Sequence, residues 1–166
     1  NDTLNSYAHP AISPDGEWIY SVSDMPGGYG GLDLWRVEMG GRFIGAENLG
    51  PDINTSGNEM FPTFRKNGEL YFSSDGHPGM GGLDIFKAVQ LTDSTWTIEN
   101  MKSPVNSFAD DFGMTFEGDY TRGFFTSNRN DGRGRDNIYS FELPETVHKI
   151  TGWVYEKDGY ELTDAI

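Results

Sequence analysis

The sequence contains no cysteine, which excludes disulfide bridges, thiolate metal sites and a cysteine nucleophile. Basic residues are also few, since 12 lysines and arginines stand against 26 aspartates and glutamates, for a formal net charge of −14. Such a charge repels phosphate backbones and anionic lipid surfaces, so we expect no nucleic-acid partner. Long hydrophobic runs are missing too, and none approaches the roughly 18 residues that a membrane span requires.

Glycine and aromatic residues, in contrast, are abundant: the chain has 22 glycines in 166 residues, and 14% of its residues are aromatic. Short apolar runs alternate with Asp-Gly, Asn-Gly, Gly-Gly and Pro-Gly pairs. Helical periodicity does not persist beyond about two turns in any stretch. The composition therefore predicts an all-β protein made of short strands and tight turns.

The chain repeats itself with a period of about 52 residues. Three parts of each copy recur: a Pro-containing run before an Asp-Gly or Asn-Gly turn, a glycine-rich part that ends in an apolar strand, and an Asn-containing connection. The matching segments are 9–17, 61–69 and 113–119 for the first part, 23–35, 74–86 and 127–139 for the second, and 53–59 and 105–111 for the connection. Repetition at a fixed spacing indicates a modular architecture.

Each copy predicts four strands, joined in turn by a tight hairpin, a glycine-rich loop and a short turn. In the first copy we expect these strands at about 8–13, 17–23, 33–38 and 42–49. One such meander buries only one face well, so the copies must pack face to face, and four-stranded units of about 40–50 residues do so as the blades of a β-propeller.

The predicted fold is therefore an all-β, β-propeller fragment of four-stranded antiparallel blades. It spans 1–145, with repeats at about 7–58, 59–110 and 111–145, and its ring is incomplete. A β-sandwich is the alternative, but it leaves the long-range repeat unexplained.

These residues carry a family resemblance over 7 to about 143. The pattern Pro-x-Phe/Ile-x-x-Asp/Asn-Gly, followed by Tyr-x-Ser-Ser-Asp-x-x-Gly-Gly-x-Gly-Gly-x-Asp-Ile/Leu-Phe/Trp, resembles the TolB-like, tryptophan-aspartate-type propeller repeats of Bacteroidetes cell-envelope proteins. The resemblance implies a propeller that is associated with the periplasm or the outer membrane.

The segment 146–166, which holds Ile-Thr-Gly-Trp-Val-Tyr-Glu-Lys-Asp-Gly at 150–159, looks like the first strand of a carboxypeptidase-regulatory-like, immunoglobulin-type β domain. A propeller followed by such a domain is similar to envelope lipoproteins that end in an outer-membrane-protein-A-type peptidoglycan-binding domain, a component of the type IX secretion system among them. Three blades cannot close a ring without exposing two sheet faces. We therefore expect a fragment of a longer polypeptide, its missing blades supplied by further sequence or by a second copy.

No pattern points to catalysis, so we expect no catalytic residues and no enzyme activity. The three histidines lie in different repeats, and neither a Gly-x-Ser-x-Gly nor a His-Glu-x-x-His motif is present. The glycine loops are not phosphate loops, because each enters a strand and not a helix. We expect no cofactor and assign no metal.

Aspartates mark the glycine-rich loops of all three copies. Two interpretations stay open: calcium ligation, since acids at both ends of a short loop gather oxygens, and a structural role in which each carboxylate binds its own loop's amides. Repetition in every copy favours the structural role. The loop acids are Asp24, Asp33, Asp75, Asp84 and Asp136.

In a four-stranded blade, the loop between the second and third strands and the connection to the next blade emerge at the same end, where function concentrates on the longest loops. The loop at 128–136 holds three arginines, whereas the equivalent loops of the first two copies hold none. Two interpretations of this loop stay open: a solvated loop, and a cationic patch that contacts a carboxylate or a glycan. We expect the arginines of such a patch to add little to the stability of the fold. The candidate partner-binding residues are Asn128, Arg129, Arg133 and Arg135, with Tyr29 and His77 in the other two loops.

We interpret the chain as a non-catalytic scaffold module of the cell envelope that binds other envelope proteins. The partners that we expect are proteins of a secretion or outer-membrane complex. A glycan-binding propeller is the alternative. Exposed aromatic side chains on the loops would favour a sugar, and an acidic and apolar face would favour a protein. Asp-Thr-Leu at 2–4 and Asp-Ser-Thr at 93–95 resemble Bacteroidetes O-glycosylation sequons, which would modify Thr3 and Ser94.

Overall fold

The computed structural model describes residues 4–40, 45–130 and 134–144. The predicted immunoglobulin-type strand at 146–166, together with Thr3 and Arg133, lies outside these residues. The strands are β1 (Tyr7–Ile12), β2 (Trp18–Ser23), β3 (Asp33–Glu38), β4 (Glu47–Asn48), β5 (Glu59–Phe64), β6 (Leu70–Ser74), β7 (Asp84–Thr92), β8 (Thr95–Asn100), β9 (Asp111–Phe116), β10 (Arg122–Ser127) and β11 (Asn137–Glu142).

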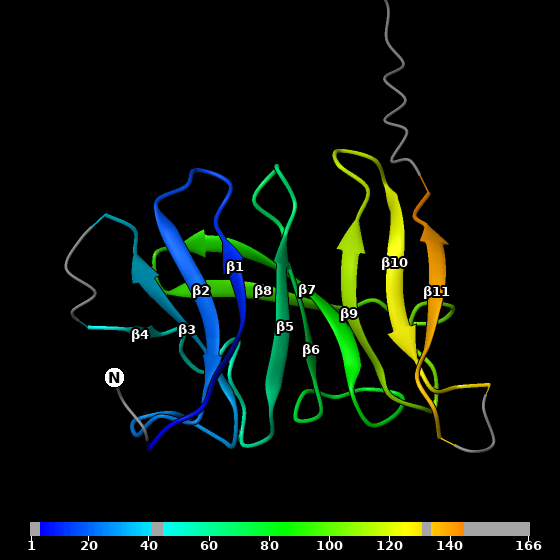
Figure 1. Cartoon of the computed structure of the whole chain (residues 1–166), viewed down its shortest axis with the longest axis horizontal. Coiled ribbons are helices and arrows are strands. Elements are labelled where there is room, and N and C mark those ends of the chain that lie inside the picture. Colours follow the sequence, from blue (N-terminus) through cyan, green and yellow to red (C-terminus); the bar gives the residue numbers. More distant parts are fainter. Residues whose placement is uncertain (1–3, 41–44, 131–133, 145–166) are drawn as a thin grey trace, which may run out of the picture.

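These strands form three antiparallel sheets, in the orders β1-β2-β3-β4, β5-β6-β7-β8 and β11-β10-β9 (Figure 1). Each sheet comes from one sequence repeat. The described residues contain no helix, and their three sheets do not close into a ring. The prediction of an all-β, antiparallel protein is confirmed, whereas the propeller stays a prediction.

The strands of the first sheet lie close to their expected places, except for the fourth. Among the described residues β4 has two residues and pairs with Trp35 and Arg36, whereas the sequence predicts a strand over 42–49, of which 42–44 lie outside the described residues. Glycine accounts for part of this difference, because Gly45 adopts a φ of 88°, which interrupts an extended strand.

Two apolar clusters hold the sheets together. In the first, Tyr20 and Leu34 of the first sheet pack with Leu70 and Phe72 of the second. The second cluster joins the second sheet to the third, and its buried members are Tyr71, Ile85, Val105, Met114 and Phe125. Each fully buried side chain of this size contributes about 1.5–3 kcal/mol, so the sheet-to-sheet contacts supply most of the stabilising burial.

The first strands of the three sheets lie side by side (Figure 1). They carry a column of stacked rings. The ring centroids of His9 and Phe61 are 4.0 Å apart, and those of Phe61 and Phe112 are 5.0 Å apart. His9 and Phe61 lie at β-bulges with φ of 49° and 57°, where the third sheet has Gly113 at 66°. Positive φ is uncommon for bulky residues. Here it belongs to the β-bulges, which turn these side chains along the column, where their rings stack.

Acid is expected to weaken the fold through His9. Burial disfavours the charged imidazole and lowers the pKa of His9 below its ordinary value of 6.5. The unfolded chain therefore binds more protons just below pH 6.5, so this histidine's contribution to stability is complete above that pH and is lost as the pH falls through it. We expect the free energy of unfolding of the parent protein to decrease more than that of His9→Phe when the pH is lowered from neutral to mildly acidic.

Urea unfolding of both proteins at each pH measures this difference. Phenylalanine suits the site, because Phe61 occupies the equivalent bulge at a similar φ. Equal losses for the two proteins would show that His9 is not the acid-sensitive group.

Candidate functional site

The long loops gather at one end of the three sheets (Figure 1). We call this surface the loop face and define it by the five segments 24–32, 49–58, 75–83, 101–110 and 128–130. Its loops are bonded to one another: Gly31 N donates to Gly57 O at 2.8 Å, and Glu59 N donates to Leu32 O at 2.6 Å. The loop face is therefore a connected scaffold and not a set of separate loops.

A buried asparagine fastens each connection to the preceding sheet. Asn54 accepts a hydrogen bond from Leu34 N at 2.8 Å and donates to Leu34 O at 2.9 Å. Asn106 makes the same pair of bonds with Ile85, at 2.8 Å each. Sequence reasoning missed this role, although the repeated Ile/Val-Asn-Thr/Ser of the connections was the signal for it.

Buried acids begin the first strands of the second and third sheets. Glu59 accepts hydrogen bonds from Thr55 N at 2.9 Å, Thr55 Oγ1 at 2.7 Å and Ser74 Oγ at 2.7 Å. Asp111 likewise accepts bonds from Ser107 N at 2.6 Å and Ser107 Oγ at 2.8 Å. These carboxylates, which sequence reasoning did not identify, lock each connection to the strand that follows it.

Asp33 and Asp84 bind the amides of their own glycine loops. Asp33 accepts from Tyr29 N at 2.6 Å and Gly30 N at 3.1 Å, and Asp84 accepts from Met80 N at 2.7 Å and Gly81 N at 2.9 Å. These contacts match the structural role that the repetition favoured.

The acids at the loop starts also have partners within the chain. Asp75 accepts bonds from Asn58 N at 2.6 Å and Asn58 Nδ2 at 2.8 Å, and Asp24 accepts from Ser6 N at 2.6 Å. No group of three or more acidic or histidine side chains suited to a metal ion occurs in the described part of the chain. The calcium interpretation gains no support from this geometry.

The placement of Asp136 as the third loop acid is wrong. Asn137 pairs with Ser127 in register, just as Asp84 pairs with Ser74 and Asp33 with Ser23. Asp136 thus stands one residue earlier, where it is exposed. The third loop has an asparagine at the equivalent position, and its Nδ2 donates to Arg135 O at 3.1 Å.

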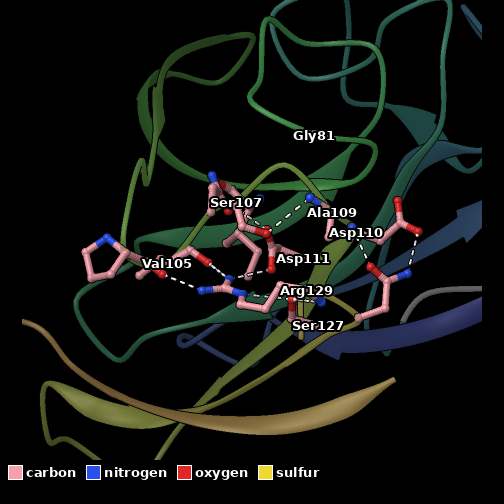
Figure 2. A network of polar contacts seen from close by, with 12 residues as sticks. Gly81, Val105, Ser107, Ala109, Asp110, Asp111, Ser127 and Arg129 are labelled. Atoms are coloured by element: carbon pink, nitrogen blue, oxygen red, sulfur yellow. Dashed lines mark hydrogen bonds and ion pairs between the residues drawn. The ribbon is translucent and has the colours of Figure 1, made fainter. Parts of the chain in front are cut away.

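Arg129 is built into the fold, which corrects its assignment as a partner-binding residue (Figure 2). Its guanidinium donates to Pro104 O at 2.7 Å and also to Val105 O, and it forms an ion pair with Asp111. The side chain is only 15% exposed, and its guanidinium lies over the ring of Phe125 at 5.0 Å. Because its donors are used inside the chain, Arg129 is not available to a partner's carboxylate.

Asn128 and His77 are corrected in the same way. Asn128 accepts a bond from Asp110 N and donates one to Asp110 Oδ2, both at 3.0 Å. His77 Nε2 lies 2.8 Å from Ile53 O, and its ring packs beside Phe86 at 5.1 Å. Both side chains therefore fasten loops, and both are only partly exposed.

His77 and Arg129 bind equivalent backbone carbonyl groups in neighbouring repeats. Ile53 and Val105 hold equivalent positions in the two connections, and each gives its carbonyl to one of these side chains. Of the other arginines in this loop, Arg135 is exposed, and Arg133 lies outside the described residues.

Three apolar side chains on the loop face point to solvent. Tyr29 and Met80 occupy equivalent places in two glycine loops and are 52% and 51% exposed, and Phe108 of the next connection is 80% exposed. Tyr29 is the one candidate from the sequence that the structure describes as both exposed and apolar. Met80 and Phe108 were missed, because a single apolar residue in a glycine-rich segment gives no periodic signal.

Ser94, the second candidate for O-glycosylation, lies in the exposed turn between β7 and β8. Its amide donates to Thr92 Oγ1 at 3.4 Å, and the hydroxyl groups of Thr92 and Thr95 lie 2.6 Å apart. The turn is thus accessible at the serine.

Comparison with protein-family models gives no match to this chain, and comparison with curated proteins gives none either. No helix of the described residues is long and apolar enough to cross a membrane.

Proposed function

We propose that this chain is a non-catalytic protein-binding scaffold module whose three sheets are consecutive β-propeller blades. The propeller arrangement is supported by the adjacent first strands with their ring column and by the repeated sheet-to-sheet packing. Further support comes from the resemblance of the repeats to TolB-like propellers. That resemblance also supports an envelope location, with partners in a secretion or outer-membrane complex.

The observation that carries the binding proposal is the exposure of Tyr29, Met80 and Phe108 on an interlocked loop face. Tyrosine, phenylalanine and methionine are enriched at protein interfaces. A partner that covers them gains apolar burial, and because the loops are already bonded to one another, little ordering entropy is lost.

The polar groups of the loop face, and of the strand ends next to it, support a scaffold more than an enzyme. Glu59, Asp111 and His77 are all engaged in hydrogen bonds that hold loops in place. A general acid or base must instead be free to reach the proton that it transfers. These three groups, whose chemistry would suit catalysis, are therefore used for structure.

Removing the three exposed side chains is expected to weaken partner binding at least tenfold in Tyr29→Ala/Met80→Ala/Phe108→Ala. A factor of ten corresponds to about 1.4 kcal/mol, and truncation of a single interface hot spot often costs about 2 kcal/mol or more. The measurement is recovery of cross-linked envelope proteins on the immobilised chain, followed by titration of the main recovered species. Leu91→Ala is the matched control, since Leu91 is an exposed apolar residue at the opposite end of β7.

Unchanged affinity in the triple variant, or an equal loss in Leu91→Ala, would contradict the loop face as the contact surface. A glycan-binding module is the second candidate, because two of the three exposed side chains are aromatic and can stack on sugar rings. Binding of the purified chain to envelope polysaccharide, with loss in Tyr29→Ala and Phe108→Ala but not in Met80→Ala, would favour that candidate.

A further inference from the structure

The third sheet exposes two large apolar side chains on the side away from the second sheet, beside the polar residues Arg122, Ser140 and Glu142. Phe124 of β10 and Ile138 of β11 are 51% and 78% exposed on this face. Their chain neighbours Phe125 and Tyr139 point the other way, into the cluster shared with the second sheet. Two large apolar side chains at neighbouring positions of one sheet face form a candidate contact surface.

The other two sheets show what covers these positions. Phe124 stands at the same register position in its sheet as a tyrosine in each of the other sheets, and Ile138 matches a leucine and an isoleucine. All four equivalents are buried, because the next sheet packs on them. The equivalents of Phe124 are Tyr20 and Tyr71, and those of Ile138 are Leu34 and Ile85.

The surface that complements this face lies at the other end of the chain. At the two internal interfaces, Tyr20 meets Phe64 at 4.7 Å and Tyr71 meets Phe116 at 4.8 Å, measured between ring centroids. Ile12 of β1 occupies the register position of those phenylalanines and is exposed, on the side of the first sheet that no other described sheet covers. Ile12 of the first sheet thus stands at the position from which a phenylalanine covers the tyrosine at each internal interface.

We propose that a second copy of this chain covers both faces, with the first sheet of each copy packed on the third sheet of the other. Contacts of this head-to-tail kind generate rings when the rotation closes. Propellers have about four to eight blades, and two copies that contribute three described sheets each fall within that range. The structure therefore points to a closed ring of six sheets made by two copies.

This inference rests on the propeller arrangement proposed above, but not on the partner of the loop face. The faces that pair lie on the flanks of the outer sheets, so Tyr29, Met80 and Phe108 stay exposed in the two-copy ring. Self-association and partner binding can therefore fail independently, each in its own experiment.

Sedimentation velocity of the whole chain, from micromolar to near-millimolar concentration, tests the proposal. Each copy carries a net charge of −14, and the runs therefore use about 0.15 M salt, where the screening length is about 8 Å. We expect a species with the mass of two copies, and a single-copy mass at the same concentrations for Phe124→Asp/Ile138→Asp and for Ile12→Asp. Leu91→Asp, on an exposed position outside both faces, is expected to keep the two-copy mass.

Mixing the two kinds of variant makes the test specific. Phe124→Asp/Ile138→Asp retains the face on the first sheet, and Ile12→Asp retains the face on the third sheet. Neither variant can pair with itself, but one of each can form a single intact contact. We expect the equimolar mixture to regain a two-copy species at concentrations where each variant alone stays single.

Several outcomes would overturn the proposal. One is a parent chain that stays single up to near-millimolar concentration, and another is a mixture that fails to associate although both variants keep the far-ultraviolet circular dichroism of the parent. A two-copy mass in Ile12→Asp alone would mean that third sheets pair with each other. Mass that grows with concentration beyond two copies would replace the closed ring with an open filament.

Discussion

Arg129→Ala is expected to lower the free energy of unfolding by about 3–5 kcal/mol, the usual cost of removing one partner of a buried ion pair. Asp111 is fully buried, and Arg129 is its one cationic partner among the described residues. The substitution also removes the donors to Pro104 O and Val105 O. In a domain of this size each kcal/mol corresponds to about 2–4 °C, so the melting temperature should fall by about 10 °C.

Four further variants, one of them Asp111→Asn alone, are compared by thermal unfolding to find the cause of this loss. Arg129→Lys keeps the charge but lacks the planar fork that reaches two carbonyls and a carboxylate together, and we expect it to be intermediate. Arg129→Ala/Asp111→Asn should lose less than the sum of the single variants, because the orphaned charge is gone. Arg122→Ala breaks an exposed pair with Glu117 and should change the melting temperature little. An Arg129→Ala protein as stable as Arg122→Ala would mean that Asp111 finds water or another donor.

Gly81→Ala is expected to destabilise the protein by about 3 kcal/mol, at the upper end of the usual cost of overpacking. An added Cβ would lie 2.7 Å from Ser107 O and 2.8 Å from Phe108 C, and closer still to Ala109 O. These are backbone atoms of a connection that Asn106 and Asp111 hold in place. Because none of them can rotate away, the glycine loop has to leave the connection.

Gly68→Ala is the matched control for this substitution. Gly68 has a φ of 91° and open space around its Cβ position, so alanine there costs only the conformational strain, about 1–2 kcal/mol. Chemical denaturation should rank Gly81→Ala as the less stable variant, although Gly81 needs no positive φ. The reverse order would show that the loop and the connection separate easily. Gly81→Ala should also shift the neighbouring Met80 and Phe108, and thereby weaken partner binding.

The features that the sequence predicted well are local or repeated. The Asp-Gly and Asn-Gly turns at Gly16 and Gly68, the first three strands of the first sheet and the structural role of Asp33 each depend on residues a few positions apart, so short patterns report them. The misplacement of Asp136 came from matching the residue type and not the spacing. Ten positions separate Ser23 from Asp33 and Ser74 from Asp84, and the same spacing from Ser127 leads to Asn137.

The role of Arg129 could not be read in this way. Its partners Asp111 and Pro104 are 18 and 25 positions away, and an arginine in a glycine-rich loop looks the same in sequence whether it is solvated or buried. The equivalence of Arg129 and His77 could not be predicted from the sequence either, because two different residue types bind the equivalent carbonyls of Val105 and Ile53. Only the packing of the loops shows that the third repeat uses the guanidinium of Arg129 for this contact, where the second repeat uses the imidazole of His77.

The packing of the sheets makes the chain a linear array. No strand of the first sheet contacts a strand of the third among the described residues, so the middle sheet has two neighbours and each outer sheet has one. In such an array the stability is approximately a sum of unit and nearest-neighbour terms, and opening begins at the ends, where only one coupling must be broken. A second copy would convert the line into a cycle, in which no unit is terminal and every opening breaks two couplings.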